Sequence, residues 1–171
     1  MLSALLFLLS ACSNYQIKEE APARPDLSKY KTVFVGWIDM GSSNWKEMGY
    51  NNESDWARQI REINVDVFLP AVKQALGNKN LVLAKTLNER PAGDLAVVFS
   101  KTSIERRWNG FSGGYDYIHT TVDFIDLRNK KNVYKGSIWS SSKGWGPQGW
   151  RFEGRLGFAT VNIADYIASK F

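Results

Sequence analysis

The chemistry open to this sequence is limited by how few reactive side chains it has. Among its 171 residues there is one histidine, His119, and one cysteine, Cys12. A catalytic histidine needs a partner within hydrogen-bond reach. Asp123 shares a face with His119 in an alternating segment, but at the rise of a β-strand the two are about 13 Å apart. That strand therefore supplies neither a His–Asp dyad nor a two-ligand metal site, and a histidine satisfied by its surroundings is the simpler interpretation.

Paired carboxylates are the other catalytic device that the composition allows. Glycoside hydrolysis needs two Asp or Glu side chains at a fixed separation, and the candidates are Asp39, Glu47, Glu53 and Glu153. No local spacing makes any two of them a pair. The sequence also has no P-loop, GxSxG, HExxH or EF-hand pattern. We therefore expect a protein that is not an enzyme and has no cofactor or metal, with a small glycan-acting hydrolase as an alternative.

The single cysteine follows a short apolar segment. Residues 1–11 carry no charge and are far shorter than the roughly 20 residues that span a bilayer, which is typical of a secretory signal peptide. The last residues before the cysteine, Leu9-Ser10-Ala11, together with Cys12 resemble a bacterial lipobox. The resemblance implies that Cys12 is lipidated, becomes the mature N-terminus and is unavailable as a nucleophile. One feature departs from the pattern, since no Lys or Arg precedes the apolar segment. An N-terminal helix with a buried cysteine is the alternative.

The residues after Cys12 bear on location. Ser13 in the next position resembles lipoproteins sorted to the outer membrane of Gram-negative cells. Lys18-Glu19-Glu20 also resembles the export tag of surface lipoproteins in Bacteroidota, although a solvated charge cluster is the simpler interpretation. Residues 12–28 are polar and contain prolines, which predicts a flexible tether. We therefore expect a protein anchored to the outer membrane by lipid, on a side that the sequence leaves undecided.

Residues 29–171 are expected to form a single α+β domain. Apolar and alternating patterns predict strands over 31–40, 81–86, 94–108, 115–127 and 133–141. Helical spacing predicts a helix over 54–76, interrupted at Pro70, and a second over 156–167. This order predicts a mostly antiparallel sheet of about five strands with two helices packed on one face, in two layers.

Several phrases resemble a family of small bacterial outer-membrane lipoproteins known only as a domain of unknown function. The phrases are residues 26–32 before the first strand, 92–98 opening the third, and the hairpin formed by 122–126 and 134–137. The chain departs from that family between Gly36 and Asp66. The resemblance implies an outer-membrane location and an α+β domain with strand and helix order β-α-β-β-β-β-α. It carries over no catalytic residue.

Aromatic residues are unusually frequent in so small a domain. Seven Trp, seven Tyr and nine Phe make up 13% of the chain. Trp37 and Trp56 are expected in the core, whereas Trp145 and Trp150 lie in a Gly-rich segment with few other large apolar residues. Such rings either fold back over the sheet or form a binding surface, because exposed aromatic rings stack on sugars and on peptide partners.

Charge adds to this expectation. Residues 128–155 contain seven basic residues and one acidic residue, a net +6 against +5 for the whole chain. Such a basic, aromatic surface is typical of nucleic-acid binding, but an envelope lipoprotein does not meet nucleic acid, so an anionic lipid headgroup, lipopolysaccharide or an acidic glycan is the expected partner. A solvated charged face is the alternative for the charges, and an accessory subunit that docks an envelope protein is the alternative function. The candidate surface comprises Trp108, Trp145, Trp150, Arg106, Arg107 and Arg151.

Overall fold

The computed structural model describes residues 15–21, 25–107, 115–142 and 147–171. Cys12, Trp108 and Trp145, three of the residues singled out from the sequence, lie outside these ranges. The elements, in chain order, are β1 (Tyr15–Ala21), β2 (Thr32–Val35), α1 (Glu53–Glu62), the π-helical segment η1 (Ile63–Phe68), α2 (Leu69–Ala75), β3 (Asn80–Leu83), β4 (Leu95–Glu105), β5 (Tyr117–Asp126), β6 (Lys131–Ser141), the 3-10 turn η2 (Pro147–Trp150) and α3 (Phe152–Ala168).

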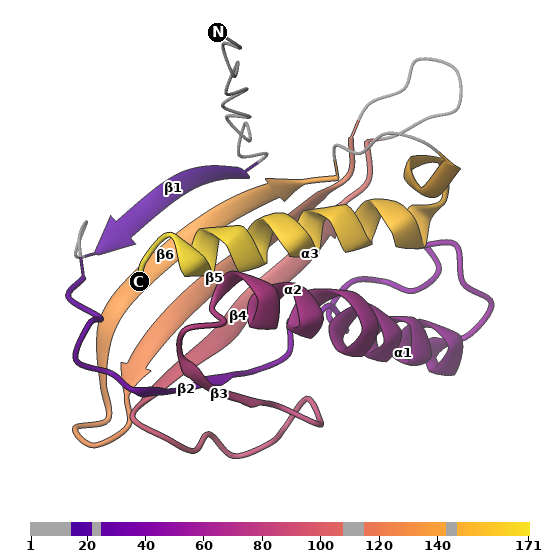
Figure 1. Ribbon diagram of the computed structural model, residues 1–171. Helices are drawn as coiled ribbons and strands as arrows, with labels where there is room; N and C mark the ends of the chain where they lie inside the picture. The colour runs from indigo at the N-terminus through magenta and orange to yellow at the C-terminus, as the bar shows by residue number, and fades with distance from the viewer. Residues whose placement is uncertain (1–14, 22–24, 108–114, 143–146) are drawn as a thin grey trace, which may run out of the picture.

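The sheet has six strands in the order β1-β6-β5-β4-β2-β3 (Figure 1). The α+β class is confirmed, whereas the sheet has six strands in place of about five and is mixed, not purely antiparallel. β1, β6, β5 and β4 pair antiparallel, whereas β2 pairs parallel with both β4 and β3. The parallel β2–β3 pair follows from connectivity, because the helical segment between the two strands returns the chain to the same end of the sheet, as in a βαβ unit. Residues 84–94 return the chain again before β4, which is therefore parallel to β2 as well.

The extra strand comes from the segment predicted to be a flexible tether. β1 pairs along β6 from Tyr15 opposite Ser140 to Ala21 opposite Lys135, with an irregularity between Ile17 and Glu19. The tether prediction is therefore wrong for these residues. Their lack of an apolar period reflects an edge strand, whose solvent-facing side chains leave little pattern to detect. Within the described ranges, no helix is long and apolar enough to cross a membrane.

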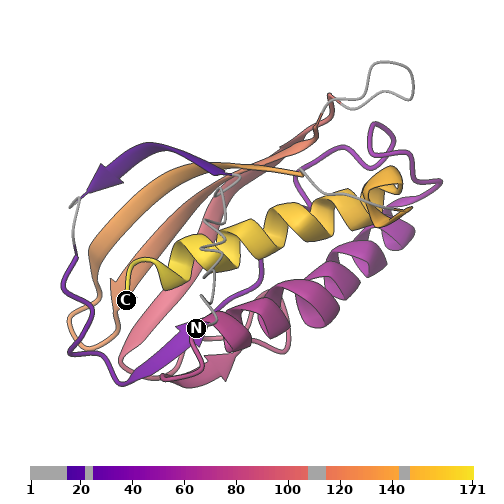
Figure 2. The same cartoon turned by 45° about the horizontal axis from the view of Figure 1, so that its top comes forward.

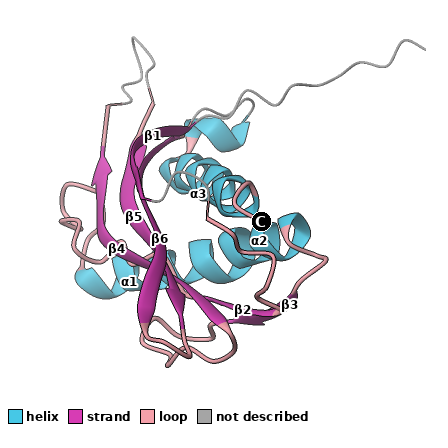
Figure 3. Cartoon of the chain, turned by 90° about the vertical axis from the view of Figure 1, so that its left-hand side faces the viewer, coloured by secondary structure: helices cyan, strands magenta, loops and turns pink. Residues whose placement is uncertain are grey.

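Two helical segments cover one face of the sheet, so the two-layer prediction holds (Figures 2 and 3). One is the continuous run α1-η1-α2, and the other is α3, which packs beside it. Trp56, Phe68, Leu156 and Ile163 contribute to the core between the helices and the sheet, together with Phe124 on the sheet. Trp56 is buried as predicted, whereas Trp37 is half-buried and donates from its indole N–H to the Ala84 carbonyl at 2.8 Å.

Pro70 lies in the first turn of α2 and changes the hydrogen-bond pattern of the first helical run without breaking the run, because it has no N–H to donate. The bonds before it widen to the π pattern, in which the Leu69 N–H donates to the Asn64 carbonyl five residues back. The Asn64 side chain is fully buried, accepts from the Ile38 N–H at 2.8 Å and donates to the carbonyls of Ile38 and Ile60. The Gly36 N–H still donates to the Val97 carbonyl of β4, but at Ile38 the backbone bonds to the helix instead of continuing the sheet ladder. The strand predicted over 31–40 accordingly ends at Val35.

Candidate functional site

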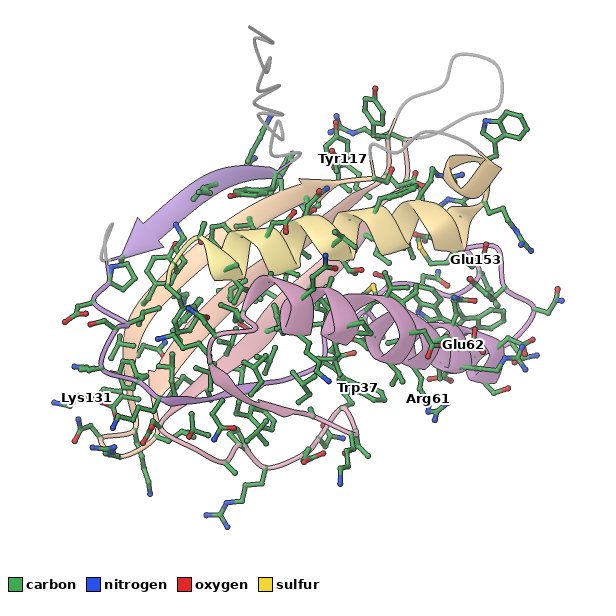
Figure 4. The ribbon with its side chains drawn as sticks, viewed as in Figure 1. Trp37, Arg61, Glu62, Tyr117, Lys131 and Glu153 are labelled. Carbon is green, nitrogen blue, oxygen red and sulfur yellow. The ribbon has the colours of Figure 1, made fainter. Side chains whose placement is uncertain are left out.

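The strongly basic segment does not form one surface. The sheet has a hairpin end, defined by the β5–β6 turn at residues 127–130, and a loop end, defined by the end of β4 and the start of β5 with η2 beside them. Arg128 and Lys130 lie at the hairpin end, whereas Arg151 follows η2 at the loop end. Figure 4 shows Lys131 far from Tyr117 and Glu153. The +6 of residues 128–155 is therefore divided between opposite ends of the molecule.

A buried ion pair organises the loop end. The Arg155 Nε lies 2.8 Å from the Asp116 Oδ2, with the two side chains 3% and 0% exposed. The other Asp116 carboxylate oxygen accepts from the Arg107 N–H, and the Asp116 N–H donates to the Ser142 Oγ. Arg155 also donates from Nη1 to the Trp150 carbonyl at 2.9 Å. One pair thus joins the ends of β4, β5 and β6 to η2 and α3.

This framework brings together the predicted site residues that the structure describes. Trp150 is 73% exposed, and Arg151 beside it is exposed at the N-cap position of α3. The Arg106 guanidinium lies 4.6 Å from the centre of the Phe152 ring and donates to the Glu47 carbonyl. Arg107 is fixed by the Glu105 carboxylate, 2.5 Å from its Nε. We call Arg106, Arg107, Trp150 and Arg151 the loop-end surface.

A second group of aromatic and charged side chains continues from Arg107 across neighbouring strands. The Arg107 guanidinium lies 5.2 Å from the centre of the Tyr117 ring. The His119 ring centre is 3.9 Å from that of Trp139, and the Lys18 ammonium lies 3.1 Å from the latter. Sequence reasoning missed this group because its members come from β1, β5 and β6. The one sequence feature that could have indicated this group is the β5–β6 hairpin, whose register places His119 opposite Trp139.

His119 has an acidic partner after all, from the adjacent strand. Its Nε2 lies 3.1 Å from the Glu105 Oε2, so the prediction that β5 alone provides no dyad is consistent with the structure. Burial is the largest effect on the histidine and lowers its pKa below the ordinary value, Glu105 opposes this, and Lys18 and Arg107 add to it. His119 thus has a hydrogen-bond partner in Glu105, and the folded protein favours its neutral form.

Three carboxylates line a groove between α1-η1 and α3. The groove has a volume of about 360 Å³ and is lined by Glu62, Asp66 and Glu153 among mostly apolar residues, including Ile63 and Phe158. Figure 4 shows Glu62 and Glu153 on the facing helices. The Glu153 carboxylate accepts from the Tyr50 hydroxyl at 3.1 Å. Glu153 was among the sequence candidates for a carboxylate pair, so the hydrolase alternative retains a concave site.

The Tyr50 hydroxyl is the most perturbed titratable group beside this groove. Burial raises its pKa above the ordinary value, and the charge of Glu153 and its hydrogen bond add to the rise. Tyr50 therefore stays protonated and serves Glu153 as a hydrogen-bond donor. No cluster of three metal-ligating side chains occurs within the ranges that the structure describes.

Comparisons with known proteins identify no family. No family model matches the chain, and no curated protein matches it. Among solved structures, a PelC dodecamer from Paraburkholderia phytofirmans is 12% identical, with a TM-score of 0.45 over 88% of this chain and 94% of that chain. A single-residue variant of that dodecamer is 11% identical, with a TM-score of 0.42 over 88% and 93% of the two chains. These likenesses are too distant to carry an inference about what the present chain does.

Proposed function

We propose that this chain is a lipid-anchored protein of the bacterial outer membrane that binds an anionic envelope component through the loop-end surface and catalyses no reaction. The exposure of Trp150 is the observation that carries the proposal. A large ring that is 73% exposed buries little apolar area, so its position contributes little to folding. Its backbone is nevertheless held by the buried Arg155. An exposed ring on an anchored backbone is suited to stacking on a ligand.

The arginines beside Trp150 determine the chemistry of the partner. Arg106, Arg107 and Arg151 are exposed at the same end, and guanidinium groups bind carboxylates and phosphates through paired hydrogen bonds. Glu105 already engages Arg107, so a ligand there competes with a carboxylate for the same guanidinium. An acidic glycan or an anionic lipid headgroup satisfies both requirements, a surface for stacking and a negative charge.

Binding to an acidic polysaccharide tests the proposal. Alginate serves as the probe, and the protein carries Cys12→Ala so that no anchor contributes. Trp150→Ala and the triple change Arg106→Gln, Arg107→Gln, Arg151→Gln are each expected to weaken alginate binding about tenfold or more. The control changes Arg128, Lys130 and Lys131 to Gln, which removes the same charge at the hairpin end. An equal loss in the control would show that only net charge matters and would refute a specific loop-end site.

The anchor requires a separate experiment. Cys12→Ala is expected to release the protein from the outer-membrane fraction, because several acyl chains at roughly 0.8 kcal/mol per buried CH₂ would otherwise hold it there. The acyl groups should be absent from the N-terminal peptide of the purified variant in mass spectrometry. A variant that still sediments with the membrane at an unchanged mass would contradict the lipoprotein proposal. Photocrosslinking from position 150 tests the accessory-subunit alternative, which a single stoichiometric protein would support.

The groove between α1-η1 and α3 supports a second candidate function, hydrolysis of a glycan by paired carboxylates. Glu62 and Glu153 are the residues on facing helices, and two carboxyl groups flanking a sugar are what such hydrolysis requires. Turnover of peptidoglycan fragments that is abolished by Glu153→Gln and by Glu62→Gln would establish it. Glu53→Gln, an exposed change at the start of α1, is the matched control. No turnover by the unmodified protein would remove this candidate.

A further inference from the structure

β3 leaves one edge of the sheet open. In the strand order it is the last member, and among the described strands it pairs with β2 alone. The Asn80 N–H donates to the carbonyl of Lys31, the residue before β2, and the Ala84 N–H donates to the carbonyl of Val35 in β2. Because the amide groups of successive residues in a strand point to opposite sides, those of Leu81 and Leu83 point away from β2. The edge therefore offers two N–H and two C=O groups to another strand.

The ends of this edge are closed by the chain itself. At its start the Lys79 N–H donates to the Leu76 carbonyl. At its end the Lys85 N–H donates to the Glu89 carboxylate at 2.6 Å. The open segment is thus confined to the residues between these two bonds. The edge of β4 beyond β2, by contrast, is covered, because Ser42 and Ser43 bond the Thr102 carbonyl and the Ile104 N–H.

An apolar groove follows the open edge. Two adjoining hollows of about 430 and 530 Å³ share Leu83 and Lys73 in their walls. Leu81 and Leu83 of β3 line one side, and Leu69 and Pro70 of α2 line the other. Alternate side chains of an added strand would point into these hollows, because side chains alternate between the faces of a sheet.

The rim of the groove is basic. Arg61, Lys73, Lys79 and Lys85 line the two hollows, and no Asp or Glu does. Lys79 already donates to the Tyr30 carbonyl at 3.3 Å, whereas Arg61, Lys73 and Lys85 are exposed. Glu62 and Asp66 of the same helical run line the separate groove against α3. The Glu89 carboxylate lies at the end of the edge, where it accepts from the Lys85 N–H. This distribution of charge selects a negatively charged occupant.

We propose that the β3–α2 groove binds an acidic peptide in extended conformation, which adds a strand to the edge of β3. Main-chain hydrogen bonds to Leu81 and Leu83 supply affinity, alternate apolar side chains fill the hollows, and carboxylates meet Lys73 and Lys85. The open edge favours a peptide over a lipid, because an acyl chain leaves those amide groups unpaired. The peptide site lies apart from the loop-end surface and does not depend on the function proposed for that surface.

Hydrogen exchange provides the first test. The probe is a synthetic peptide that alternates Glu and Val, added at millimolar concentration to the folded protein. The amides of Leu81 and Leu83 should exchange more slowly with the peptide present, whereas that of Val82, which points toward β2, should not change. A peptide N-methylated at every residue, which lacks all main-chain N–H donors, should not bind. Unchanged exchange at Leu81 and Leu83, or equal binding of the methylated peptide, would overturn the proposal.

Charge reversal provides the second test. Lys73→Glu combined with Lys85→Glu should weaken peptide binding about tenfold or more, because each change replaces an attraction with a repulsion. Lys131→Glu combined with Lys135→Glu, at exposed positions on β6, should leave it unchanged. Phosphatidylglycerol vesicles that bind through Lys73 and Lys85 while the peptide does not would assign the groove to a lipid and refute the proposal. Protection of Leu81 and Leu83 that rises with protein concentration alone would assign it to a second copy.

Discussion

The two ends of the sheet each contain an Asp–Arg pair, in very different surroundings. At the loop end Asp116 and Arg155 are 2.8 Å apart and almost fully buried. At the hairpin end Asp94 and Arg128 are 2.7 Å apart, with side chains 22% and 76% exposed. The two distances are nearly equal, but water screens the Asp94–Arg128 pair, which contributes little to stability, and does not screen the Asp116–Arg155 pair, whose disruption is costly. The structure of the loop end therefore depends on the Asp116–Arg155 ion pair.

The hairpin end depends instead on main-chain hydrogen bonds to carboxylates. Asp94 accepts from the Lys31 and Thr32 N–H groups, and Asp126 accepts from those of Arg128 and Asn129. The Tyr30 hydroxyl donates to Asp126, and burial together with this bond raises the pKa of Tyr30 to about 12. Three phrases noted in the sequence, 26–32, 92–98 and 122–126, meet here. This end is a structural junction, whereas the loop end presents exposed aromatic and basic groups.

Arg155→Met should have the largest effect of any change at either end. It removes the guanidinium that faces the buried Asp116 carboxylate, and breaking a buried ion pair in this way costs about 3–5 kcal/mol of unfolding free energy. Urea unfolding measures the loss. The matched control is Arg151→Met, four residues earlier and exposed, which should leave stability unchanged within about 0.5 kcal/mol. Similar losses in the two variants would show that the burial of Asp116 and Arg155 does not matter.

Acid should weaken the hairpin end next. Hydrogen bonds from the Asn129 N–H, above all, hold the pKa of Asp126 below its ordinary value, and the Arg128 side chain does the same for Asp94. A carboxylate with a lowered pKa in the folded state contributes stability above the unfolded pKa of about 3.8, and that contribution is lost as pH falls through the folded pKa. Asp126→Asn should therefore flatten the dependence of unfolding free energy on pH below about 4. An unchanged slope would contradict this assignment.

The sequence predicts the hairpin end better than the loop end for a physical reason. Hairpin-end contacts join residues near strand termini, and alternation along β5 and β6 determines which residues meet there. The loop-end pair joins Asp116 at the start of β5 to Arg155 on a helix 39 positions later. No local pattern distinguishes that buried arginine from Arg151 or Arg128, so the sequence counts all three in the net charge of one basic segment, residues 128–155.

The sheet topology was mispredicted where short-range patterns are ambiguous. Val33 to Val35 are fully or almost fully buried, and a continuous apolar run is typical of a parallel strand flanked on both faces. The following residues, 36–40, continue the same apolar character, but the Ile38 N–H and carbonyl bond to the Asn64 side chain on the helix. The periodicity of the sequence cannot show that the strand ends because the Asn64 side chain, distant in the sequence, hydrogen-bonds to the backbone of Ile38. β1 was missed for the converse reason, since its pairing leaves no apolar pattern.

A smaller effect should distinguish the loop end near neutral pH. Burial lowers the pKa of His119 in the folded state. As pH falls, His119 is therefore protonated at a higher pH in the unfolded chain than in the folded protein. Stability is then full above the unfolded pKa of about 6.5 and is lost as pH falls from there through the folded pKa. His119→Gln should remove the change in urea midpoint between about pH 7 and pH 5. Asp126→Asn is the control, since it should leave that change intact. A change of equal size in His119→Gln would exclude His119 as its source.

Trp150→Ala should have the smallest effect on stability and therefore separates folding from binding most clearly. The ring is 73% exposed, and the hydrogen bond to Arg155 uses the Trp150 carbonyl, which the substitution retains. The unfolding free energy should stay within about 0.5 kcal/mol of the unmodified value, while alginate binding falls about tenfold or more. Arg155→Met should weaken both, since it releases the turn that carries the ring. If Trp150→Ala destabilises the fold as Arg155→Met does, the ring belongs to the core of the loop end, and the exposed binding surface proposed for it does not exist.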